Sequence, residues 1–414
     1  MTVLCTALLL SVLLLTASPA AADSVFGFSY FGREVLTGDA RIEGRAGMGL
    51  AYTDSMNASV LQATQLADLE RVTIGLTGRF SAVNAKEGIG DINRLGMSVP
   101  VIRMGMPLPG QGGLGFGFSA TRATQWTVSR AWEDPNATPD PDVEYREIIE
   151  REGTQFDVPL QVGYRFFDGL LGVGAGMHFK GGAVRIRYDI GERATDGNII
   201  SFVQREIRDD TYSGWTPELS LALHDVGPLS IAGYWMPEYE ADVDIVQATL
   251  SDPLDEPATR TDTMPQRFGM GARLQLPARF SIGADFTFEE WSAYKGRTFT
   301  YDSDGNFDPA GEALDMNDER TLRLGLERES VRVGLRYTMP VRLGFYMRDW
   351  HYKVQGEDLT EWGVTLGSGL ALLGGLSRID YSIGYSQVGD HGNIGVAESL
   401  WTIAVSIAGG ERWY

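Results

Sequence analysis

Apolar and polar residues alternate along most of the chain from residue 70 to its end. In SRIDYSIGYSQ, every second residue from Ile379 to Tyr385 is apolar, and the residues between them are acidic, hydroxyl-bearing or glycine. A period of two places neighbouring residues on opposite faces of a β-strand. The pattern predicts fourteen strands, over 70–83, 92–107, 113–130, 143–168, 170–191, 197–226, 228–250, 264–276, 279–294, 317–327, 330–349, 360–373, 376–388 and 396–407.

Two of these stretches carry arginine on the face opposite their apolar residues. In TLRLGLE, Leu322 and Leu324 lie opposite Arg323, and arginine alternates with Val, Leu and Tyr in VRVGLRYTMP, which begins at Val331. A membrane β-barrel has a lipid-facing wall and a polar lumen, so these arginines would face inward. In a soluble β-sandwich, they would face water and the leucines would face the core. These stretches alone leave both interpretations open.

The predicted connections alternate in length, which favours the barrel. Short turns are expected at 107–110, 167–169, 226–228, 277–278, 327–329 and 373–375. Longer polar stretches are expected at 84–91, 131–142, 191–197, 250–263, 295–317, 349–360 and 388–396. Bacterial outer-membrane barrels have an even number of strands, tight periplasmic turns and larger external loops. We therefore expect an all-β fold, a fourteen-stranded antiparallel transmembrane β-barrel over residues 70–414.

The last predicted strand has one apolar face and one small, polar face. From Trp401 to Ala408 the sequence WTIAVSIA alternates large apolar residues with Thr, Ala, Ser and Ala. A barrel loses its free edges only if its last strand pairs with its first. We expect this strand to pair with the strand over 70–83 and to turn its apolar face toward lipid. A final strand followed by a terminal aromatic residue, here Tyr414, also resembles the sorting signal of outer-membrane proteins.

The start of the chain predicts export. Residues 3–18 are apolar and uncharged but too short to span a bilayer comfortably. The pattern Ala20-x-Ala22 predicts signal-peptidase cleavage after Ala22, and an N-terminal membrane anchor is the alternative. The only cysteine, Cys5, lies in this segment, so neither a disulfide nor a cysteine–metal site is expected in the mature chain. The mature chain contains no apolar run long enough for a transmembrane helix.

Composition and motifs argue against several classes of function. The net charge of −20 argues against a nucleic-acid partner, because phosphate binding needs a basic surface. The four histidines are isolated, and no nucleophile, nucleotide or metal motif is present, so we expect no enzyme, no cofactor and no metal. YDSDGNFD, from Tyr301, has Phe307 and Ala313 where a calcium loop requires glycine and glutamate, so we interpret it as a solvated external loop.

Residues 23–69 precede the predicted strands and do not alternate in the same way. In SMNASVLQATQLADL, Met56, Val60, Ala63 and Ala67 share one helical face, which predicts a short helix. Non-strand segments of this length are usually functional. We expect the segment to fold inside the barrel as a partly helical plug.

These features together resemble one known family. The stretch RIEGRAGMGLAYTD (41–54), the following LADLER (66–71) and the fourteen strands are similar to the long-chain fatty acid transporter family of outer-membrane proteins. The resemblance implies a barrel closed by an N-terminal hatch. It also implies passive uptake of hydrophobic compounds, which bind near the hatch and leave sideways through the wall. The family usually carries Asn-Pro-Ala in the hatch, whereas the matching positions here are Gln62, Ala63 and Thr64.

The resemblance directs attention to apolar residues and glycines near the hatch. An apolar solute gains free energy from burial against apolar side chains. The candidate lining consists of Phe26, Phe28, Tyr30, Phe31, Met48 and Leu50, although the same residues could simply pack the plug against the wall. Glycines could serve as plug hinges or as a kink in the third strand that opens a side exit, or they could permit tight turns and a lumen face beneath the plug. The candidates are Gly47 and Gly49 in the plug, and Gly113, Gly115 and Gly117 in the third strand.

The first expected function is therefore a monomeric outer-membrane channel for hydrophobic small molecules. Its expected surroundings are outer-membrane lipid and lipopolysaccharide, with the barrel assembly machinery as a partner during biogenesis. A structural or protein-secretion-associated barrel of the same fold, without transport, is the alternative. A general diffusion porin is disfavoured because the N-terminal segment would block the lumen.

Overall fold

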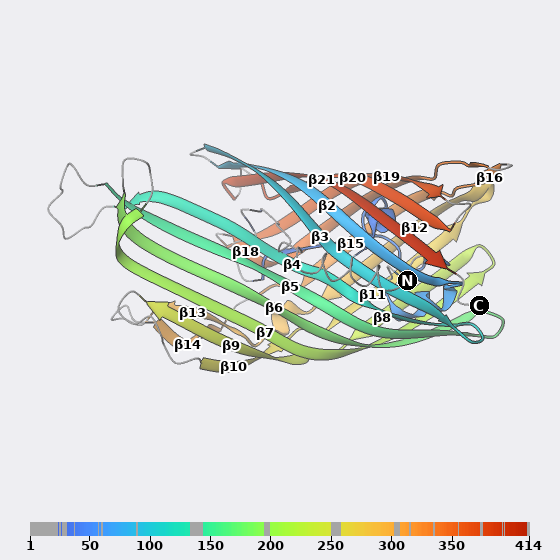
Figure 1. Ribbon diagram of the computed structural model, residues 1–414, viewed down its shortest axis with the longest axis horizontal. Coiled ribbons are helices and arrows are strands. Elements are labelled where there is room, and N and C mark those ends of the chain that lie inside the picture. Colours follow the sequence, from blue (N-terminus) through green and yellow to red (C-terminus); the bar gives the residue numbers. More distant parts are fainter. Residues whose placement is uncertain are drawn as a thin grey trace, which may run out of the picture.

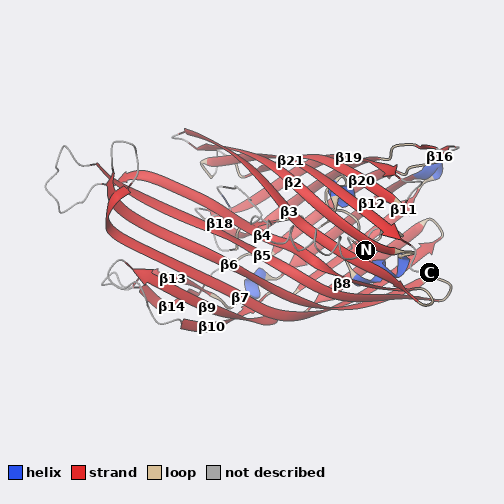
Figure 2. Cartoon of the chain, viewed as in Figure 1, coloured by secondary structure: helices blue, strands red, loops and turns tan. Residues whose placement is uncertain are grey.

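The computed structural model describes residues 24, 26, 31–36, 38–56, 58, 61–87, 90–132, 144–193, 199–249, 258–301, 307–313, 316–333, 336–354, 356–372, 376–390, 392 and 394–411. Its dominant feature is a closed antiparallel β-barrel (Figure 1, Figure 2). The predicted leader 1–22 and the terminal Tyr414 lie outside the described residues. No helix among the described residues is long and apolar enough to cross a bilayer.

Fourteen strands form the wall, and each pairs with its neighbours in chain order. They are β2 (Val72–Glu87), β3 (Gly90–Leu108), β4 (Gly112–Trp132), β5 (Glu144–Phe166), β6 (Leu171–Arg193), β7 (Ile199–Val226), β8 (Leu229–Met236), β11 (Arg267–Gln275), β12 (Phe280–Glu289), β15 (Glu319–Arg328), β18 (Val341–Val354), β19 (Glu357–Leu372), β20 (Ser377–Val388) and β21 (Val396–Glu411). The last strand pairs with the first, from Val72 opposite Glu411 to Glu87 opposite Val396. This closure confirms the predicted fourteen-stranded barrel.

Two predicted strands are interrupted. The segment predicted over 228–250 divides into β8 and β9 (Tyr239–Thr249) at Pro237, which has no N–H for the ladder. β9 continues along β7, and β10 (Ala258–Met264) pairs with β9. The strand predicted over 264–276 therefore begins earlier, as β10, and continues as β11.

The structure corrects the prediction for residues 327–349. β16 (Arg332–Val333) pairs with β17 (Arg336–Tyr337) in a separate two-stranded sheet. The expected tight turn at 327–329 is therefore wrong, and so is the expectation that VRVGLRYTMP lies in the wall. The period of two was read correctly as a strand signal, but a local hairpin and a wall strand share that period.

The outer face of the wall is apolar, as the alternation predicted. On β15, Leu322 and Leu324 are exposed outward and Arg323 is buried in the lumen. On β21, Trp401, Ile403 and Ile407 are outward, and alternate small residues face inward. Aromatic rings also run from strand to strand on this face, with centroid separations of 5.0 to 6.1 Å. The two rows are Phe118–Phe156–Phe179–Trp215 and Trp362–Tyr385–Trp401. Such aromatic girdles mark the membrane–water interface.

One side of the barrel is much taller than the other. β5, β6 and β7 continue past the aromatic row, and Glu144 lies twelve residues beyond Phe156, roughly 40 Å at the rise of an extended strand. These long strands, with β9, β10 and the hairpin of β13 (Arg297–Tyr301) and β14 (Phe307–Ala313), extend toward the left of Figure 1. They carry the external ends of the barrel far beyond the bilayer.

The described residues between Ser24 and Leu69, here called the luminal segment, pack against the inner face of the wall. The segment contains β1 (Arg33–Glu34), α2 (Ala40–Glu43) and the 3-10 helix η2 (Ala63–Asp68). The predicted helix over 55–69 is thus reduced to η2, and Val60 lies outside the described residues. The short strand β1 and helix α2 were not predicted from the sequence, because tertiary pairing rather than local periodicity forms them.

Candidate functional site

The barrel ladder is interrupted between β3 and β4. The two strands pair from Leu108 opposite Gly112 only as far as Val101 opposite Ser119, although β3 continues to Gly90 and β4 to Trp132. Pro100 stands where the pairing ends, and it has no N–H to donate. Residues 90–100 of β3 and 120–132 of β4 are therefore not joined by ladder hydrogen bonds, and we call this unpaired interval the β3–β4 slit. Leu95 and Met97, on its β3 side, are 85% and 62% exposed on the outer face.

The luminal segment covers the edge of β4 that β3 leaves. β1 pairs antiparallel with β4, with Arg33 opposite Ala123 and Glu34 opposite Arg122, and Val35 N donates to Thr121 O at 2.8 Å. Val35 also packs with Ala120 and Ala123. The approach is close at Gly32, which has a φ of +74°, and a Cβ there would overlap the Ala123 carbonyl. β1 thus takes the place of a wall strand just inside the slit.

Charged side chains fix β1 across the lumen. Arg33 forms an ion pair with Glu361 and donates to Ser386 Oγ at 2.9 Å. Glu34 points to the other side and contacts three guanidinium groups, those of Arg267, Arg323 and Arg348. Arg33 is 7% exposed, and a second carboxylate, that of Glu398 at 3.6 Å, also compensates its buried charge.

A second anchor lies near the turn end of the barrel, around α2. Asp39 caps α2 by accepting from Ile42 N at 2.9 Å. Glu327 of β15 accepts from Arg45 at 2.6 Å and from Arg342 at 2.9 Å, and it also contacts Arg41. Both Arg45 of the luminal segment and the wall carboxylate Glu327 are almost fully buried. This node joins the luminal segment to two wall strands.

Two carboxylates of the luminal segment differ in their ionisation. Burial disfavours the charge of Asp54, but the guanidinium groups of Arg378 and Arg41 hold its pKa well below the usual range. Burial and the neighbouring Asp380 carboxylate raise the pKa of Asp39 to about 6. Asp54 therefore keeps its charge in the ion-pair network, whereas Asp39 loses its charge in mildly acidic solution.

A third anchor holds η2 on a floor of wall glycines. Added Cβ atoms at Gly113 and Gly115 of β4 would meet Leu66, and those at Gly163 of β5 and Gly174 of β6 would meet the backbone at Ala63. Only glycine lets the backbones approach this closely. At the start of η2, Glu218 of β7 accepts from Ala63 N at 2.7 Å. His178 Nε2 lies 2.8 Å from the other oxygen of Glu218, so the contact is part of a wall network.

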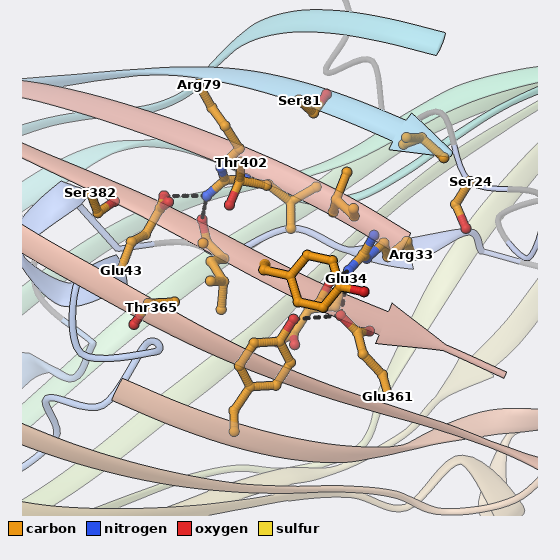
Figure 3. A pocket seen from close by; sticks show the side chains of 18 of the residues that line it. Ser24, Arg33, Glu34, Glu43, Arg79, Ser81, Glu361, Thr365, Ser382 and Thr402 are labelled. Atoms are coloured by element: carbon orange, nitrogen blue, oxygen red, sulfur yellow. Dashed lines mark hydrogen bonds and ion pairs between the residues drawn. The ribbon is translucent and has the colours of Figure 1, made fainter. Parts of the chain in front are cut away.

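A cavity of about 80 Å³ lies between β1 and the wall, next to the slit (Figure 3). Residues 33–36 and Glu43 of the luminal segment line one side, and Ser98 of β3 lies on the other. The remaining wall comes from β2 and β18–β21. Two more cavities flank the luminal segment, one of about 430 Å³ around Arg41 and Asp54 and one of about 70 Å³ beside Leu50.

The predicted lining residues are spread over separate packing clusters. Phe26 packs in one cluster with Trp350 and Tyr352, and Phe31 packs in another with Trp291 and Tyr294. Phe28 and Tyr30 lie outside the described residues. Neither Phe26 nor Phe31 lines the 80 Å³ cavity.

Met48 and Leu50 of the luminal segment pack against the inner face of the wall. Met48 is fully buried, and added Cβ atoms at Gly283 and Gly325 would meet its side chain. Leu50 packs with Tyr234 and Met236 and borders the 70 Å³ cavity. The four described candidates thus lie in separate parts of the lumen.

The predicted hinge and kink glycines have distinct surroundings. Gly47 has a φ of +82° and lies against Leu36 and Arg323. The space beside Gly49 is bounded by Leu61 and Arg45. Gly113 and Gly115 lie directly against Leu66 of η2, whereas a Cβ at Gly117 would overlap the Ile102 carbonyl of β3. The ladder break lies beyond all three strand glycines, at Ser119.

Sequence reasoning missed the residues that shape this site. The β3–β4 ladder ends next to Pro100, and the strand β1 that pairs with β4 there consists of Arg33 and Glu34. Pro100 within an otherwise alternating strand was the one available local signal, because proline interrupts a ladder. The described residues contain no group of three or more His, Cys, Asp or Glu side chains that could hold a metal ion.

Comparison with solved structures identifies the fold. A Pseudomonas aeruginosa FadL homologue superposes with a TM-score of 0.63 at 11% identity, over 91% of this chain and 99% of that chain. The Pseudomonas putida toluene transporter TodX gives 0.60 at 12% identity, over 92% and 100%. The CymD monoaromatic hydrocarbon channel gives 0.56 at 13% identity, over 92% and 99%. The chain therefore has the fold of these outer-membrane channels, and the resemblance expected from the sequence is confirmed at the level of the fold.

Sequence comparison gives a different kind of match. A family model described as BamG matches residues 237–414, which run from the end of β8 to the end of the chain. No curated protein matches the sequence. The matched part contains seven complete wall strands but not the luminal segment or the β3–β4 slit.

Proposed function

We propose that the protein is an outer-membrane channel for the passive entry of hydrophobic compounds. In this proposal, residues 1–22 are removed on export and residues 23–69 act as a hatch. A solute binds beside the luminal segment and leaves sideways through the β3–β4 slit into the membrane. The proteins with the same fold include channels and transporters for toluene and other monoaromatic hydrocarbons, which supports this reading.

One observation carries the proposal. The wall ladder stops at Val101 and Ser119, and the open edge of β4 is held by a short plug strand rather than by a wall strand. A strand of two residues has few ladder hydrogen bonds, so its separation from β4 costs far less than opening a complete wall seam. The adjoining cavity would then communicate with the bilayer.

The test is a reversible cross-link between the plug strand and β4. Val35 and Ala123 pack in one cluster on paired strands, so Val35→Cys with Ala123→Cys is the cross-linking pair, and mass spectrometry of the oxidised protein first verifies the disulfide. The only native cysteine, Cys5, lies in the expected leader. In cells without other such channels, we expect oxidation to reduce uptake of radiolabelled oleate and toluene about tenfold or more, and reductant to restore it.

A matched control places the same bond in the closed wall. Ile282 of β12 and Leu326 of β15 are directly opposed, so Ile282→Cys with Leu326→Cys adds a disulfide away from the slit. Uptake in this variant should not respond to oxidation. Undiminished uptake through an oxidised Val35–Ala123 cross-link would contradict the lateral route.

A second function has its own support in the family match. The name BamG points to the barrel assembly machinery, and the match covers the wall rather than the slit. A barrel that serves as a subunit of such an assembly needs no moving hatch, and the buried ion pairs around Glu327 suit a fixed one. If the cross-link leaves uptake unchanged and the protein co-purifies from outer membranes with barrel assembly subunits, this function replaces the channel.

A further inference from the structure

Four hydroxyl groups line the wall side of the 80 Å³ cavity without partners. They belong to Ser81 of β2, Ser98 of β3, Ser382 of β20 and Thr402 of β21. Ser81 and Thr402 are direct cross-strand neighbours, and Ser98 and Ser382 are 8% and 5% exposed. Within the described part of the chain, none of the four hydroxyls is hydrogen-bonded. Ser81 and Thr402 are only partly buried, so these hydroxyls face the space of the cavity and can both donate to and accept from a molecule that occupies it.

The charged groups around the same cavity are already balanced. The lining includes three guanidinium groups and three carboxylates. Each guanidinium has a carboxylate partner: Arg33 with Glu361, Arg79 with Glu43, and Arg348 with Glu34 (Figure 3 draws the first two of these residue pairs). A ligand carboxylate would enter as an additional buried negative charge and would have to displace one of these partners.

The apolar part of the lining comes from the luminal segment and the wall. Val35 and Leu36 of the luminal segment, Val83 of β2 and Leu400 of β21 form it. The cavity of about 80 Å³ is smaller than the roughly 150 Å³ apolar cavity that admits benzene. It therefore accepts a head group and a few carbon atoms, and a longer apolar tail would have to lie along the slit toward lipid.

From this juxtaposition we propose that the cavity takes the head group of an uncharged amphiphile, a hydrocarbon that carries a hydroxyl group. The assignment rests on the proposed channel function and specifies its substrate class. A hydroxyl both donates and accepts, which matches serine and threonine partners. A pure hydrocarbon would leave the four wall hydroxyls unpaired, and a fatty acid anion would meet the balanced ion pairs.

The experiment compares three probes of equal chain length, 1-dodecanol, dodecanoate and dodecane. Each is titrated into the purified full-length mature protein in detergent, and bound molecules are counted by native mass spectrometry. We expect 1-dodecanol to bind about tenfold more tightly than either of the others. The triple variant Ser81→Ala, Ser382→Ala and Thr402→Val keeps the cavity volume nearly unchanged, and its affinity for 1-dodecanol should fall by about tenfold or more.

The control changes three other hydroxyls of the inner wall, which do not line the cavity. Ser220→Ala, Ser230→Ala and Thr321→Val should leave 1-dodecanol binding unchanged and report any general loss of folding. Equal or tighter binding of dodecanoate would overturn the assignment, as would 1-dodecanol binding that the cavity variant does not weaken, or no binding of any probe. In each of these cases, uptake that still responds to the Val35–Ala123 cross-link would leave the channel itself standing.

Discussion

The barrel wall and the luminal segment bury opposite kinds of surface. Leu322 and Leu324 of the wall are 45% and 43% exposed on the outer face, where lipid replaces a protein core. Inside the lumen, Arg45, Glu327 and Arg342 are at most 2% exposed and form ion pairs. The wall is thus stabilised by backbone ladders and lipid, and the luminal segment by charges that have lost their water.

This difference determines how each region can move. A wall strand can separate only if a whole ladder of hydrogen bonds is lost. The luminal segment is attached by separate side-chain contacts, among them those of β1 at the slit, Glu327 near the turns and η2 on the wall glycines. A change at one node should therefore release part of the segment while the barrel stays closed.

The largest expected effect is at the Glu327 node. Glu327→Gln removes the charge that compensates Arg45 and Arg342, and breaking a buried pair in this way costs about 3 to 5 kcal/mol. We expect faster amide exchange over residues 39–54 and proteolysis of the segment in folded barrels. Glu357→Gln, on the exposed end of β19, is the matched control and should change neither. Unchanged exchange in the Glu327 variant would show that the segment is held elsewhere.

A charge on the outer wall should affect folding rather than the lumen. Leu324→Arg places a guanidinium on the lipid face of β15, which costs about 2 to 4 kcal/mol near the middle of a bilayer. The measurement is urea-dependent folding into lipid vesicles, with amide exchange of the luminal segment as a second readout. Asp358→Arg, in an exposed position on β19, introduces the same residue and should fold normally. Normal folding of the Leu324 variant would place this position outside the bilayer.

The sequence predicted the wall well because its information is local. Period-two alternation, the turn residues and the even strand count sufficed to predict the number of wall strands and to place most of them, and the inward position of Arg323 followed from the alternation alone. The error at 331–340 also has a local cause. Val331 and its alternating neighbours carry the same period as a wall strand, but β16 and β17 pair with each other.

The site was far less predictable, because its contacts join residues hundreds of positions apart. Arg33 meets Glu361, and Glu34 meets Arg348, across the closed barrel. Neither charge belongs to a motif, so only the closed topology places them together. The same holds for two apolar candidates, because Phe26 and Phe31 pack against different parts of the wall, with Trp350 and Trp291 respectively.

The smallest expected effect distinguishes two roles of the strand glycines. A Cβ at Gly113 would overlap the Leu66 carbonyl, so Gly113→Ala should displace η2 at a cost of about 1 to 3 kcal/mol. Gly78→Ala, where the nearest atom is 4.0 Å from the added Cβ, is the matched control. Amide exchange at 63–68 should rise in the first variant and not in the second. If Gly113 instead serves as a kink for the side exit, uptake would fall while the exchange of η2 stays unchanged, and the glycine floor would lose its proposed role.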